Sequence, residues 1–349
     1  MMKFQPLTVT DLQHTTRNAV VVTFDAPFDW LAGQYLTFRR DFGGTEIRRS
    51  YSICSAPGEP LRVGIKKVEG GAFSTWANAD LRVGDTLEAM PPMGRFHTEM
   101  DPEAERNFLF VAAGSGITPI LSLLKTVLTR EPKSRATLIY ANRAVNSIMF
   151  QTELDDLKSE HLTRLQIVHI LKQDAQDIDL FQGRIDAGKC AALFRDWVPV
   201  DGIDEAFICG PEGLMETVSG SLREHGMAKE RIHFELFASA QAGRLPQSQR
   251  PVAEAKPTEA TLRLDGASHV LTMDRDQSLL EAALADGIDA PYACKAGVCS
   301  TCMCRVVEGE VEMVQNHALE DYEVERGYVL SCQSYPLTDK VVVEYDSAH

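Results

Sequence analysis

The pattern of hydrophobic and polar positions changes twice along this chain of 349 residues. Up to about residue 103, short runs of alternating apolar and polar residues are separated by Gly or Pro about every ten residues. These runs cover 7–12, 19–24, 35–40, 48–53, 61–68 and 86–90. Short alternating runs between turn signals predict a small antiparallel β-barrel.

From 104 to 238, continuous apolar runs of strand length alternate with longer runs of helical period. We expect strands at 108–114, 136–142, 165–171, 205–210 and 232–237, and helices at 120–130, 149–160 and 214–226. This alternation predicts a parallel sheet with helices on both faces. Ligands of such sheets bind beyond the carboxyl ends of the strands.

The last segment changes period again, after a stretch rich in Ala, Gln and Pro at 238–257. That stretch cannot bury a core and predicts a semi-flexible linker. Beyond it we expect a hairpin at 261–266 and 269–273, a short helix at 278–287, and strands at 304–309 and 341–345. A small mixed sheet against one helix is the β-grasp arrangement. The sequence thus predicts a multidomain chain: a barrel domain at 1–103, an α/β domain at 104–238, a linker at 239–257 and a β-grasp domain at 258–349.

Charge is spread unevenly over these domains. The formal net charge is −15, and residues 258–349 hold 17 Asp/Glu against 6 Lys/Arg, a net of −11. Such acidity argues against nucleic acid and anionic membrane surfaces as partners. The acidic cluster Glu320, Asp321, Glu323 and Glu325 favours docking on a basic patch of a partner protein. The alternative is a solvated surface that keeps the protein soluble.

Four cysteines in the last domain carry the strongest chemical signal. Cys294, Cys299 and Cys302 read C-x4-C-x2-C, and Cys332 follows 30 residues later. This is the spacing of plant-type [2Fe-2S] clusters, which need four thiolates. Zinc is the alternative, but it usually takes two C-x2-C pairs or Cys/His mixtures. We therefore expect a one-electron carrier.

The other cysteines have ordinary settings. Cys54, Cys190 and Cys209 stand among apolar neighbours, as small buried hydrophobes do. Cys304 begins an alternating run, so we interpret it as a strand residue beside the cluster. The sequence has no signal peptide and no apolar run of 18 residues, and its cysteines suit a cluster better than disulfides. We expect a cytoplasmic protein.

Two glycine turns follow predicted strands of the α/β domain. Gly114-Ser115-Gly116-Ile117-Thr118-Pro119 opens one helix, and Cys209-Gly210-Pro211 opens another. Glycines let the backbone approach a pyrophosphate, and a helix N-terminus offers N–H groups. The first turn departs from G-x-G-x-x-G at Pro119 and could alone be an ordinary strand–helix turn.

The residues after the strand at 136–142 bear on the choice of nucleotide. Arg143 follows this strand, with Ser147 nearby and no acidic residue between them. An Arg can pair with a 2′-phosphate, whereas an acidic residue favours a free 2′-hydroxyl. This predicts NADPH over NADH. The alternative is a solvated loop charge.

Two motifs stand on the predicted barrel. Arg49 and Tyr51 alternate along one strand in Arg49-Ser50-Tyr51-Ser52, so they share a face and could address a phosphate and a flat ring together. Gly70-Gly71-Ala72-Phe73-Ser74 precedes a helical stretch and is a second candidate anion turn. Taken alone, the first motif could also be an unremarkable edge strand.

In this order, the motifs resemble those of ferredoxin-reductase-like flavoproteins with an appended plant-type ferredoxin domain. The resemblance covers the whole chain and is greatest to reductase components of phenylacetyl-CoA epoxidases. It implies FAD, NADPH or NADH, and a [2Fe-2S] cluster held by Cys294, Cys299, Cys302 and Cys332. Cys304 is not a ligand position in that family.

The resemblance also implies roles for individual residues. Arg49 would hold a flavin phosphate, Tyr51 would lie against the flavin ring, and Ser52 would bond near its reactive nitrogen. The FAD pyrophosphate would meet Gly71, Ala72, Phe73 and Ser74. The nicotinamide nucleotide would be lined by Gly114, Gly116, Thr118 and Pro119, with Cys209, Gly210 and Pro211 near its ring. Glu235 and Phe237 would close the site.

The implied function is an NAD(P)H-dependent oxidoreductase that passes electrons through FAD and the cluster to an oxygenase component. The resemblance implies a diiron oxygenase that epoxidises phenylacetyl-CoA in phenylacetate degradation. A reductase of a Rieske hydroxylase, steroid hydroxylase or acyl desaturase is the alternative of the same type. A non-catalytic iron–sulfur sensor is the alternative of a different class.

Overall fold

The computed structural model describes residues 4–237 and 257–346, which form two compact units on either side of residue 238. Most of the predicted linker at 239–257 lies outside the described residues. Among the described residues, no helix is long and apolar enough to cross a membrane.

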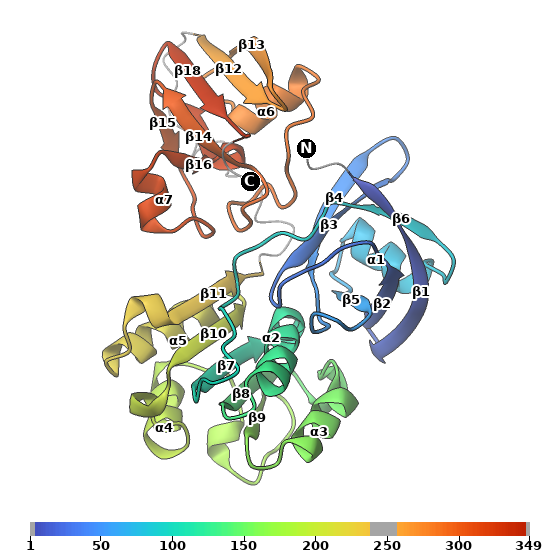
Figure 1. The fold of residues 1–349 in the computed structure, drawn as a ribbon, viewed down its shortest axis with the longest axis vertical. Helices are drawn as coiled ribbons and strands as arrows, with labels where there is room; N and C mark the ends of the chain where they lie inside the picture. The colour runs from blue at the N-terminus through green and yellow to red at the C-terminus, as the bar shows by residue number, and fades with distance from the viewer. Residues whose placement is uncertain (1–3, 238–256, 347–349) are drawn as a thin grey trace. The chain divides into compact units, whose positions relative to one another are not determined.

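The first unit begins with a six-stranded antiparallel sheet in the order β4-β3-β6-β1-β2-β5 (Figure 1). The strands are β1 (Gln5–Thr16), β2 (Ala19–Asp25), β3 (Tyr35–Asp41), β4 (Glu46–Ser52), β5 (Leu61–Lys66) and β6 (Thr86–Ala89). A bridge from Ile53 to Val63 joins the two end strands, so the sheet curls into the predicted barrel. Helix α1 (Ala72–Ala79) packs its Phe73 and Ala77 into the barrel core.

A five-stranded parallel sheet follows, in the order β11-β10-β7-β8-β9. Its strands are β7 (Asn107–Ala113), β8 (Arg135–Asn142), β9 (Leu165–Leu171), β10 (Glu205–Gly210) and β11 (Ile232–Leu236). The helices are α2 (Ile117–Arg130), α3 (Gln151–Glu160), α4 (Ala187–Asp196) and α5 (Glu212–Glu224). The chain leaves β7 toward β8 and later returns to its other side at β10. This makes β7/β10 the switch point of strand order, where ligands of such sheets bind.

The second unit holds a five-stranded mixed sheet, β13-β12-β18-β14-β16, and a two-stranded sheet of β15 and β17. The strands are β12 (Thr258–Leu264), β13 (Ala267–Met273), β14 (Met303–Glu308), β15 (Val311–Met313), β16 (Tyr328–Leu330), β17 (Ser334–Pro336) and β18 (Lys340–Glu344). Helix α6 (Leu279–Ala285) buries Leu279, Leu280, Ala282 and Ala283 against the sheet. The predicted β-grasp arrangement is confirmed, including the β12–β13 hairpin.

Some elements differ from the sequence-based expectation. Helix α4, the short helix α7 (Asp321–Glu325) and strands β15, β16 and β17 were not expected from the hydrophobic pattern. Each of α7, β15, β16 and β17 is only three to five residues long, too short for a period to be read. Helix α1 begins at Ala72, so the glycine-containing turn runs directly into the helix instead of preceding it.

Candidate functional site

The two glycine turns of the parallel sheet meet at the carboxyl ends of β7 and β10. A side chain added at Gly116 would place its Cβ atom 2.2 Å from the carbonyl oxygen of Cys209 and 3.0 Å from the amide nitrogen of Gly210. Only glycine therefore allows this approach of the two turns. The turns that the sequence pairs as a nucleotide site are adjacent in space, at the switch point of the sheet.

Buried side chains of Tyr140 and Thr118 hold the glycine turn at 114–116. Tyr140 on β8 donates a 2.8 Å hydrogen bond to the carbonyl of Gly114, which has a φ of 54°. The Thr118 hydroxyl is bonded to the carbonyl of Ser115 at 3.0 Å, and Thr118 and Pro119 are both buried. The side chains of Tyr140 and Thr118 therefore fix the shape of this turn. A glycine backbone at a helix start suits close approach of a phosphate.

The barrel motifs also lie together. Tyr51 on β4 packs against Phe73 of α1, with ring centroids 5.6 Å apart. Arg49 lies two residues before Tyr51 on the same face of β4 and bonds the carbonyl of Arg48 with one amino group. Burial raises the pKa of Tyr51, so its hydroxyl stays neutral. A flat ring therefore lies against the start of α1, and Arg49 is on the same face of β4 as that ring.

Ser74, in the first turn of α1, bonds to the backbone of the turn that precedes the helix. The Ser74 hydroxyl accepts a 3.1 Å hydrogen bond from the amide of Val68 and bonds the carbonyl of Gly71 at 3.3 Å. Gly70 has a φ of 73°, which favours glycine. The first amides of a helix have no intrahelical acceptor. Those of Ala72 and Phe73 can therefore bind a phosphate, in a turn that Ser74 stabilises.

The barrel and the parallel sheet are joined at their facing ends by Ser52 and Glu235. Ser52 on β4 donates a 3.1 Å hydrogen bond to Oε2 of Glu235 on β11. Glu235 pairs in register with Cys209 of β10, and the amide of Phe237 bonds the carbonyl of Gly210 at 3.1 Å. The contacts thus connect five residues that the resemblance assigned to this site. They come from β4, β10, β11 and the segment after β11: Ser52, Cys209, Gly210, Glu235 and Phe237.

Burial controls the charge of this group. It raises the pKa of the Glu235 carboxyl to about 7, and the bond from Ser52 opposes that rise. Burial also raises the pKa of Cys209 well above its usual value, and the carboxylate of Glu235 adds to the rise. Cys209 is therefore a neutral thiol near pH 7, and Glu235 is the group that titrates there.

Lys66 is a site residue that the sequence reasoning missed. It ends strand β5, and a side chain at Gly114 would place its Cβ 3.1 Å from the Lys66 Nζ atom. Desolvation by burial lowers the pKa of Lys66. The barrel thus places a partly buried cation against the first glycine turn. The sequence does not show which of the neighbouring lysines, Lys66 or Lys67, faces the turn. Consecutive strand residues point to opposite faces, and either face could have met the parallel sheet.

Arg143 lies at the end of β8, where an adenosine ribose was expected. It is exposed, and its Nε atom donates a 3.2 Å hydrogen bond to Oε1 of Gln173, which follows β9. The carboxylate of Asp174 accepts a 2.6 Å hydrogen bond from the amide of Val145. No acidic residue occurs between Arg143 and Ser147, but Asp174, in the segment after β9, contacts this loop.

The four predicted ligand cysteines occur as two pairs. The sulfurs of Cys294 and Cys299 are 3.1 Å apart, and Cys302 interacts most strongly with Cys332. No three His, Cys, Asp or Glu side chains within residues 4–237 and 257–346 form a single metal-binding group. The identity of the ligands therefore stays a prediction.

The surroundings of these cysteines fit a thiolate cluster. The amide of Ala296 donates a 3.3 Å hydrogen bond to Sγ of Cys294, in a loop where Lys295 and Gly297 have φ values of 53° and 71°. A hydrogen bond from Cys299, and then backbone amides, lower the pKa of Cys294. N–H groups aimed at sulfur stabilise a negatively charged cluster.

The fourth cysteine is held against the third by its neighbour. The amide and hydroxyl of Ser331 bond the carbonyl of Cys302 at 3.0 and 2.9 Å. This clamp places Cys332 beside the start of β14. Cys304 is fully buried in β14, as expected for a strand residue, and Cys54, Cys190 and Cys209 are buried too.

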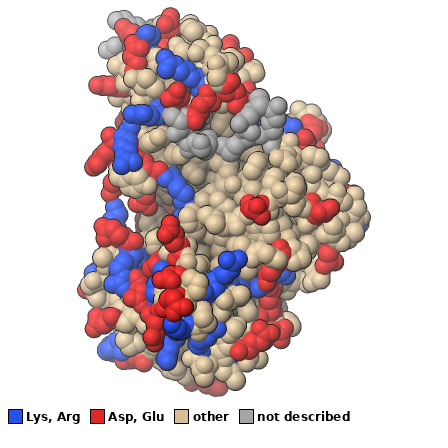
Figure 2. Space-filling model, in the orientation of Figure 1, with Lys and Arg blue, Asp and Glu red and all other residues tan. Residues whose placement is uncertain are grey.

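The acidic cluster is less uniform than its sequence indicates. Glu320, Asp321 and Glu325 are exposed, but Glu323 is only 5% exposed, and its carboxylate accepts a 2.9 Å hydrogen bond from the amide of Glu320. Glu323 caps α7 and is not available to a partner. On the face shown in Figure 2, acidic and basic side chains lie interspersed and form no single large patch of one sign.

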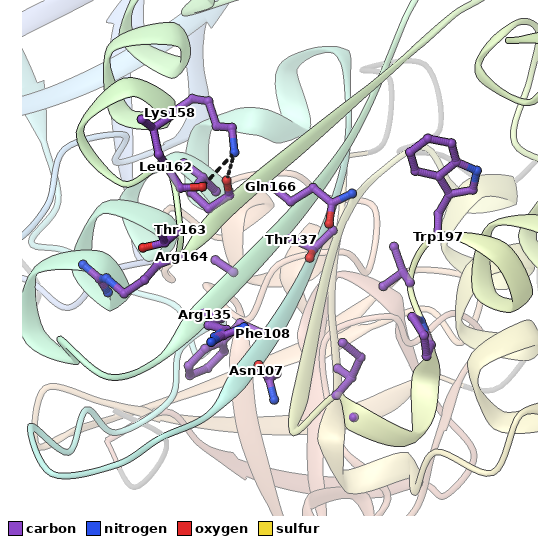
Figure 3. Close-up of a pocket in the computed structure, with 16 residues that line it drawn as sticks. Asn107, Phe108, Arg135, Thr137, Lys158, Leu162, Thr163, Arg164, Gln166 and Trp197 are labelled. Atoms are coloured by element: carbon purple, nitrogen blue, oxygen red, sulfur yellow. Dashed lines mark hydrogen bonds between the residues drawn. The ribbon is translucent and has the colours of Figure 1, made fainter.

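A hollow of about 560 Å³ lies at the opposite, amino-terminal end of the parallel sheet (Figure 3). Two of its basic side chains, Arg164 and Lys158, already have internal partners. Arg164 donates to the carbonyls of Leu128, Glu131 and Ser134. Lys158 donates to those of Leu162 and Leu165. These two cations hold loop and helix ends, and the hollow lies at the amino-terminal ends of β7, β8 and β9, whereas ligands of such sheets bind at the carboxyl ends.

Comparison with known proteins agrees with this arrangement. Family models match residues 6–98 as an oxidoreductase FAD-binding domain, 110–220 as an oxidoreductase NAD-binding domain and 262–337 as a 2Fe-2S iron-sulfur cluster binding domain. The chain is 42% identical to one of the subunits of the 1,2-phenylacetyl-CoA epoxidase of Escherichia coli, over 99% of each chain. It is 36% identical to the ferredoxin reductase component of 3-ketosteroid-9-alpha-monooxygenase of Rhodococcus rhodochrous, over 97% of this chain and 96% of that one.

Solved structures share the fold. An intact type IV self-sufficient cytochrome P450 monooxygenase matches 97% of this chain with a TM-score of 0.72 and 26% identity. This chain spans 41% of that longer protein. Phthalate dioxygenase reductase matches 98% of each chain with a TM-score of 0.60 and 22% identity. The chain belongs to the family of NAD(P)H-dependent oxidoreductases that join FAD-binding, NAD-binding and 2Fe-2S domains in one polypeptide.

Proposed function

We propose that this protein is the reductase component of an oxygenase and delivers electrons from NAD(P)H, through FAD and a [2Fe-2S] cluster, to the oxygenase component. The observation that carries the proposal is the 42% identity to a component of an epoxidase over 99% of both chains. Because the match covers 99% of both chains, it includes all three cofactor-binding domains and not one of them alone.

The residues at the junction of barrel and sheet would position the two reacting rings. Flavin accepts two electrons as a hydride and releases them singly, which a nicotinamide cannot do. Tyr51 would lie against the flavin ring, and Ser52, Cys209 and Glu235 would surround the reacting face. The glycine turn at 114–116 and Lys66 would hold the diphosphate of the nucleotide, and Arg49 with the α1 turn that of FAD. Orientation of this kind brings reacting atoms into contact without a chemical group from the protein.

Three domains would carry these steps: 1–103 for FAD, 104–238 for the nucleotide and 258–349 for the cluster, with a linker at 239–257. Cys294, Cys299, Cys302 and Cys332 would be the cluster ligands. The donor set around Cys294 and the clamp between Ser331 and Cys302 support this ligand set.

The finer proposal is that the partner is a diiron oxygenase that epoxidises phenylacetyl-CoA. A second candidate is a steroid hydroxylase, which the 36% identity to a ketosteroid monooxygenase reductase favours less. Reconstitution separates them: the purified chain and NAD(P)H are combined with either oxygenase and its substrate, and oxygenated product is measured. Product from the phenylacetyl-CoA enzyme alone supports the proposal, whereas product from the steroid enzyme alone contradicts it.

A sensor without turnover is tested by a simpler assay. The protein should reduce ferricyanide or cytochrome c with NAD(P)H at many turnovers per flavin. Loss of turnover in a preparation with full FAD and cluster content would contradict the reductase function altogether.

We further propose that NADPH is preferred over NADH through Arg143. Gln173 holds the Nε side of the guanidinium, so its two amino groups remain to pair with a 2′-phosphate. Asp174, which bonds the amide of Val145, is directed to the backbone of the same loop. The acidic surface of the last domain would be the docking surface for the oxygenase, with Glu320, Asp321 and Glu325 as its exposed carboxylates.

A further inference from the structure

Tyr345, immediately after β18, is a buried tyrosine beside the cysteine site. Its exposed fraction is 1%, and its ring belongs to the core that also contains Cys302, Cys304 and Cys332. The β14–β18 ladder pairs Arg305 with Glu344. One step further along this antiparallel register, Tyr345 lies opposite Cys304, and Cys302 is in the turn that precedes β14.

The hydroxyl of Tyr345 has no hydrogen-bond partner among the described residues. Burial raises the pKa of this hydroxyl, the nearby thiols of Cys304, Cys302 and Cys332 add to the rise, and the hydroxyl of Ser331 opposes it. Ser331 lies close without hydrogen-bond geometry, and its own hydroxyl is bonded to the Cys302 carbonyl at 2.9 Å. A buried hydroxyl without a partner is uncommon and calls for a ligand or a role.

The neighbouring sulfurs differ as acceptors. A neutral thiol such as that of Cys304 is a weak acceptor, whereas a metal-bound thiolate carries negative charge and accepts hydrogen bonds well. Cys302 and Cys332, the two proposed ligands near this hydroxyl, belong to the same buried core as Tyr345. The orphaned donor is thus next to the sulfur that becomes an acceptor when a cluster is bound.

We propose that Tyr345 donates a hydrogen bond to the sulfur of Cys302 in the cluster-loaded protein and thereby raises the reduction potential of the cluster. The inference rests on the proposed ligand set. A hydrogen bond to sulfur stabilises the reduced cluster more than the oxidised one, because the reduced cluster is more negative. Tyr345 is a positioning and tuning residue and takes no part in hydride transfer.

The test compares the cluster-loaded, full-length protein with its Tyr345→Phe variant, which keeps the ring and removes only the hydroxyl. The midpoint potential is measured by a redox titration followed by electron paramagnetic resonance. We expect the reduction equilibrium constant to fall about tenfold, which is a shift of about 59 mV toward more negative potential for one electron. Tyr322→Phe is the matched control. It removes the same chemical group from a tyrosine that is 52% exposed.

A second variant and a spectrum separate the hydroxyl from the packing of the ring. Tyr345→Leu should give the same shift as Tyr345→Phe if the hydroxyl is responsible, and it also serves if the Phe variant fails to assemble. Resonance Raman bands of the iron–cysteine stretch should shift in D₂O in the wild type and less in both variants. Equal deuterium shifts in all three proteins would overturn the proposal.

The same preparations distinguish this inference from the proposed function. A Tyr345→Phe protein with full iron and sulfide content and a wild-type potential would overturn the hydrogen bond. If NAD(P)H-dependent ferricyanide reduction persisted in it, the reductase function would stand. A wild type that binds a cluster but reduces no ferricyanide would refute the reductase function instead, while the Raman comparison still decided the role of Tyr345.

Discussion

The hydroxyl of Ser52 donates a 3.1 Å hydrogen bond to the carboxylate of Glu235, although 183 residues separate them in the chain. The bond joins strand β4 of the barrel to strand β11 of the parallel sheet. It therefore fixes the place where a flavin on the barrel would meet a nucleotide on the sheet. Disruption of this bond should alter hydride transfer before it alters the binding of either cofactor.

The first prediction concerns the pH dependence of flavin reduction. Burial raises the pKa of Glu235 to about 7, so this carboxyl is mostly neutral below pH 7 and mostly anionic above it. An anion beside the ring opposes the negative charge that hydride transfer brings to the flavin. We expect the rate of flavin reduction by NAD(P)H to fall as the pH rises through about 7.

Glu235→Gln should keep the low-pH rate across this range, because the amide cannot ionise. Stopped-flow bleaching of the flavin between pH 5.5 and 8.5 gives the measurement. Glu230→Gln, on the exposed segment before β11, should retain the wild-type inflection. If Glu235→Gln also retained it, another group would be the one that titrates.

The second prediction concerns Lys66 and its neighbour. Lys66→Ala should raise KM for NAD(P)H about tenfold with less effect on kcat, because a charge-assisted hydrogen bond to a phosphate contributes about 1.5–3 kcal/mol and this site is partly solvated. Lys67→Ala is the matched control, since Lys67 is the next residue and its side chain is exposed. Steady-state kinetics would show the difference. Equal KM values for the two variants would remove Lys66 from the site.

Lys66 also shows which features of the site the sequence can predict and which it cannot. The alternation of β5 identifies two faces but not which one meets the parallel sheet, because that depends on how the barrel packs against β7 and α2. The structure resolves this through Gly114, whose missing side chain leaves room for the Lys66 amine. The glycine turns themselves were predictable, because their chemistry lies within six consecutive residues.

The burial of Glu323 and the position of Tyr345 could not be predicted from the sequence either, because both depend on local or tertiary structure. The acidic run at 320–325 predicts four exposed charges, but Glu323 turns inward because the N-terminus of α7 needs a cap. A five-residue helix has no hydrophobic period that would reveal this. Conversely, the cysteine spacing indicates a cluster without any structure, since four ligands at fixed intervals leave few alternatives. The register that brings Tyr345 to these cysteines depends on a strand pairing that the sequence does not show.

The third prediction separates the cluster from the flavin. Cys299→Ser should remove the visible iron–sulfur absorption and leave flavin reduction by NAD(P)H intact, because the two cofactors would occupy different domains. Cys190→Ser, a buried cysteine of α4, should keep the absorption. Collapse of flavin reduction in a folded Cys299→Ser protein would contradict the modular arrangement. Absorption spectra and stopped-flow traces supply both readouts.

The fourth prediction concerns the choice of nucleotide. Arg143→Ala should lower kcat/KM for NADPH about tenfold and leave that for NADH nearly unchanged, because only NADPH has a phosphate for the guanidinium to bind. Arg130→Ala, at the far end of α2 from the glycine turn, should change neither value. The preference is disproved if wild type uses both nucleotides equally well, or if the Arg143→Ala protein keeps its NADPH efficiency.

The last prediction concerns docking by the acidic domain. Its net charge of −11 should attract a basic patch on the oxygenase over a distance of about 10 Å, and salt should weaken the attraction. Reversal of Glu320 and Asp321 to Lys should slow electron delivery to the oxygenase, yet Lys in the first turn of α7 also opposes the helix dipole. Asp321→Asn with Glu325→Gln is therefore the cleaner change, since it removes two exposed charges and keeps the cap at Glu323.

Glu259→Gln with Asp286→Asn removes the same charge from exposed positions elsewhere in the domain and controls for net charge. If docking is local, the first pair should slow single-turnover oxidation of the reduced protein by the oxygenase several-fold at low salt, and the control pair should not. Turnover with ferricyanide should stay constant in both. A docking charge acts through its position and is screened by salt. Equal delivery rates for the two pairs of variants, unchanged between low and high ionic strength, would therefore show that the acidity serves solubility.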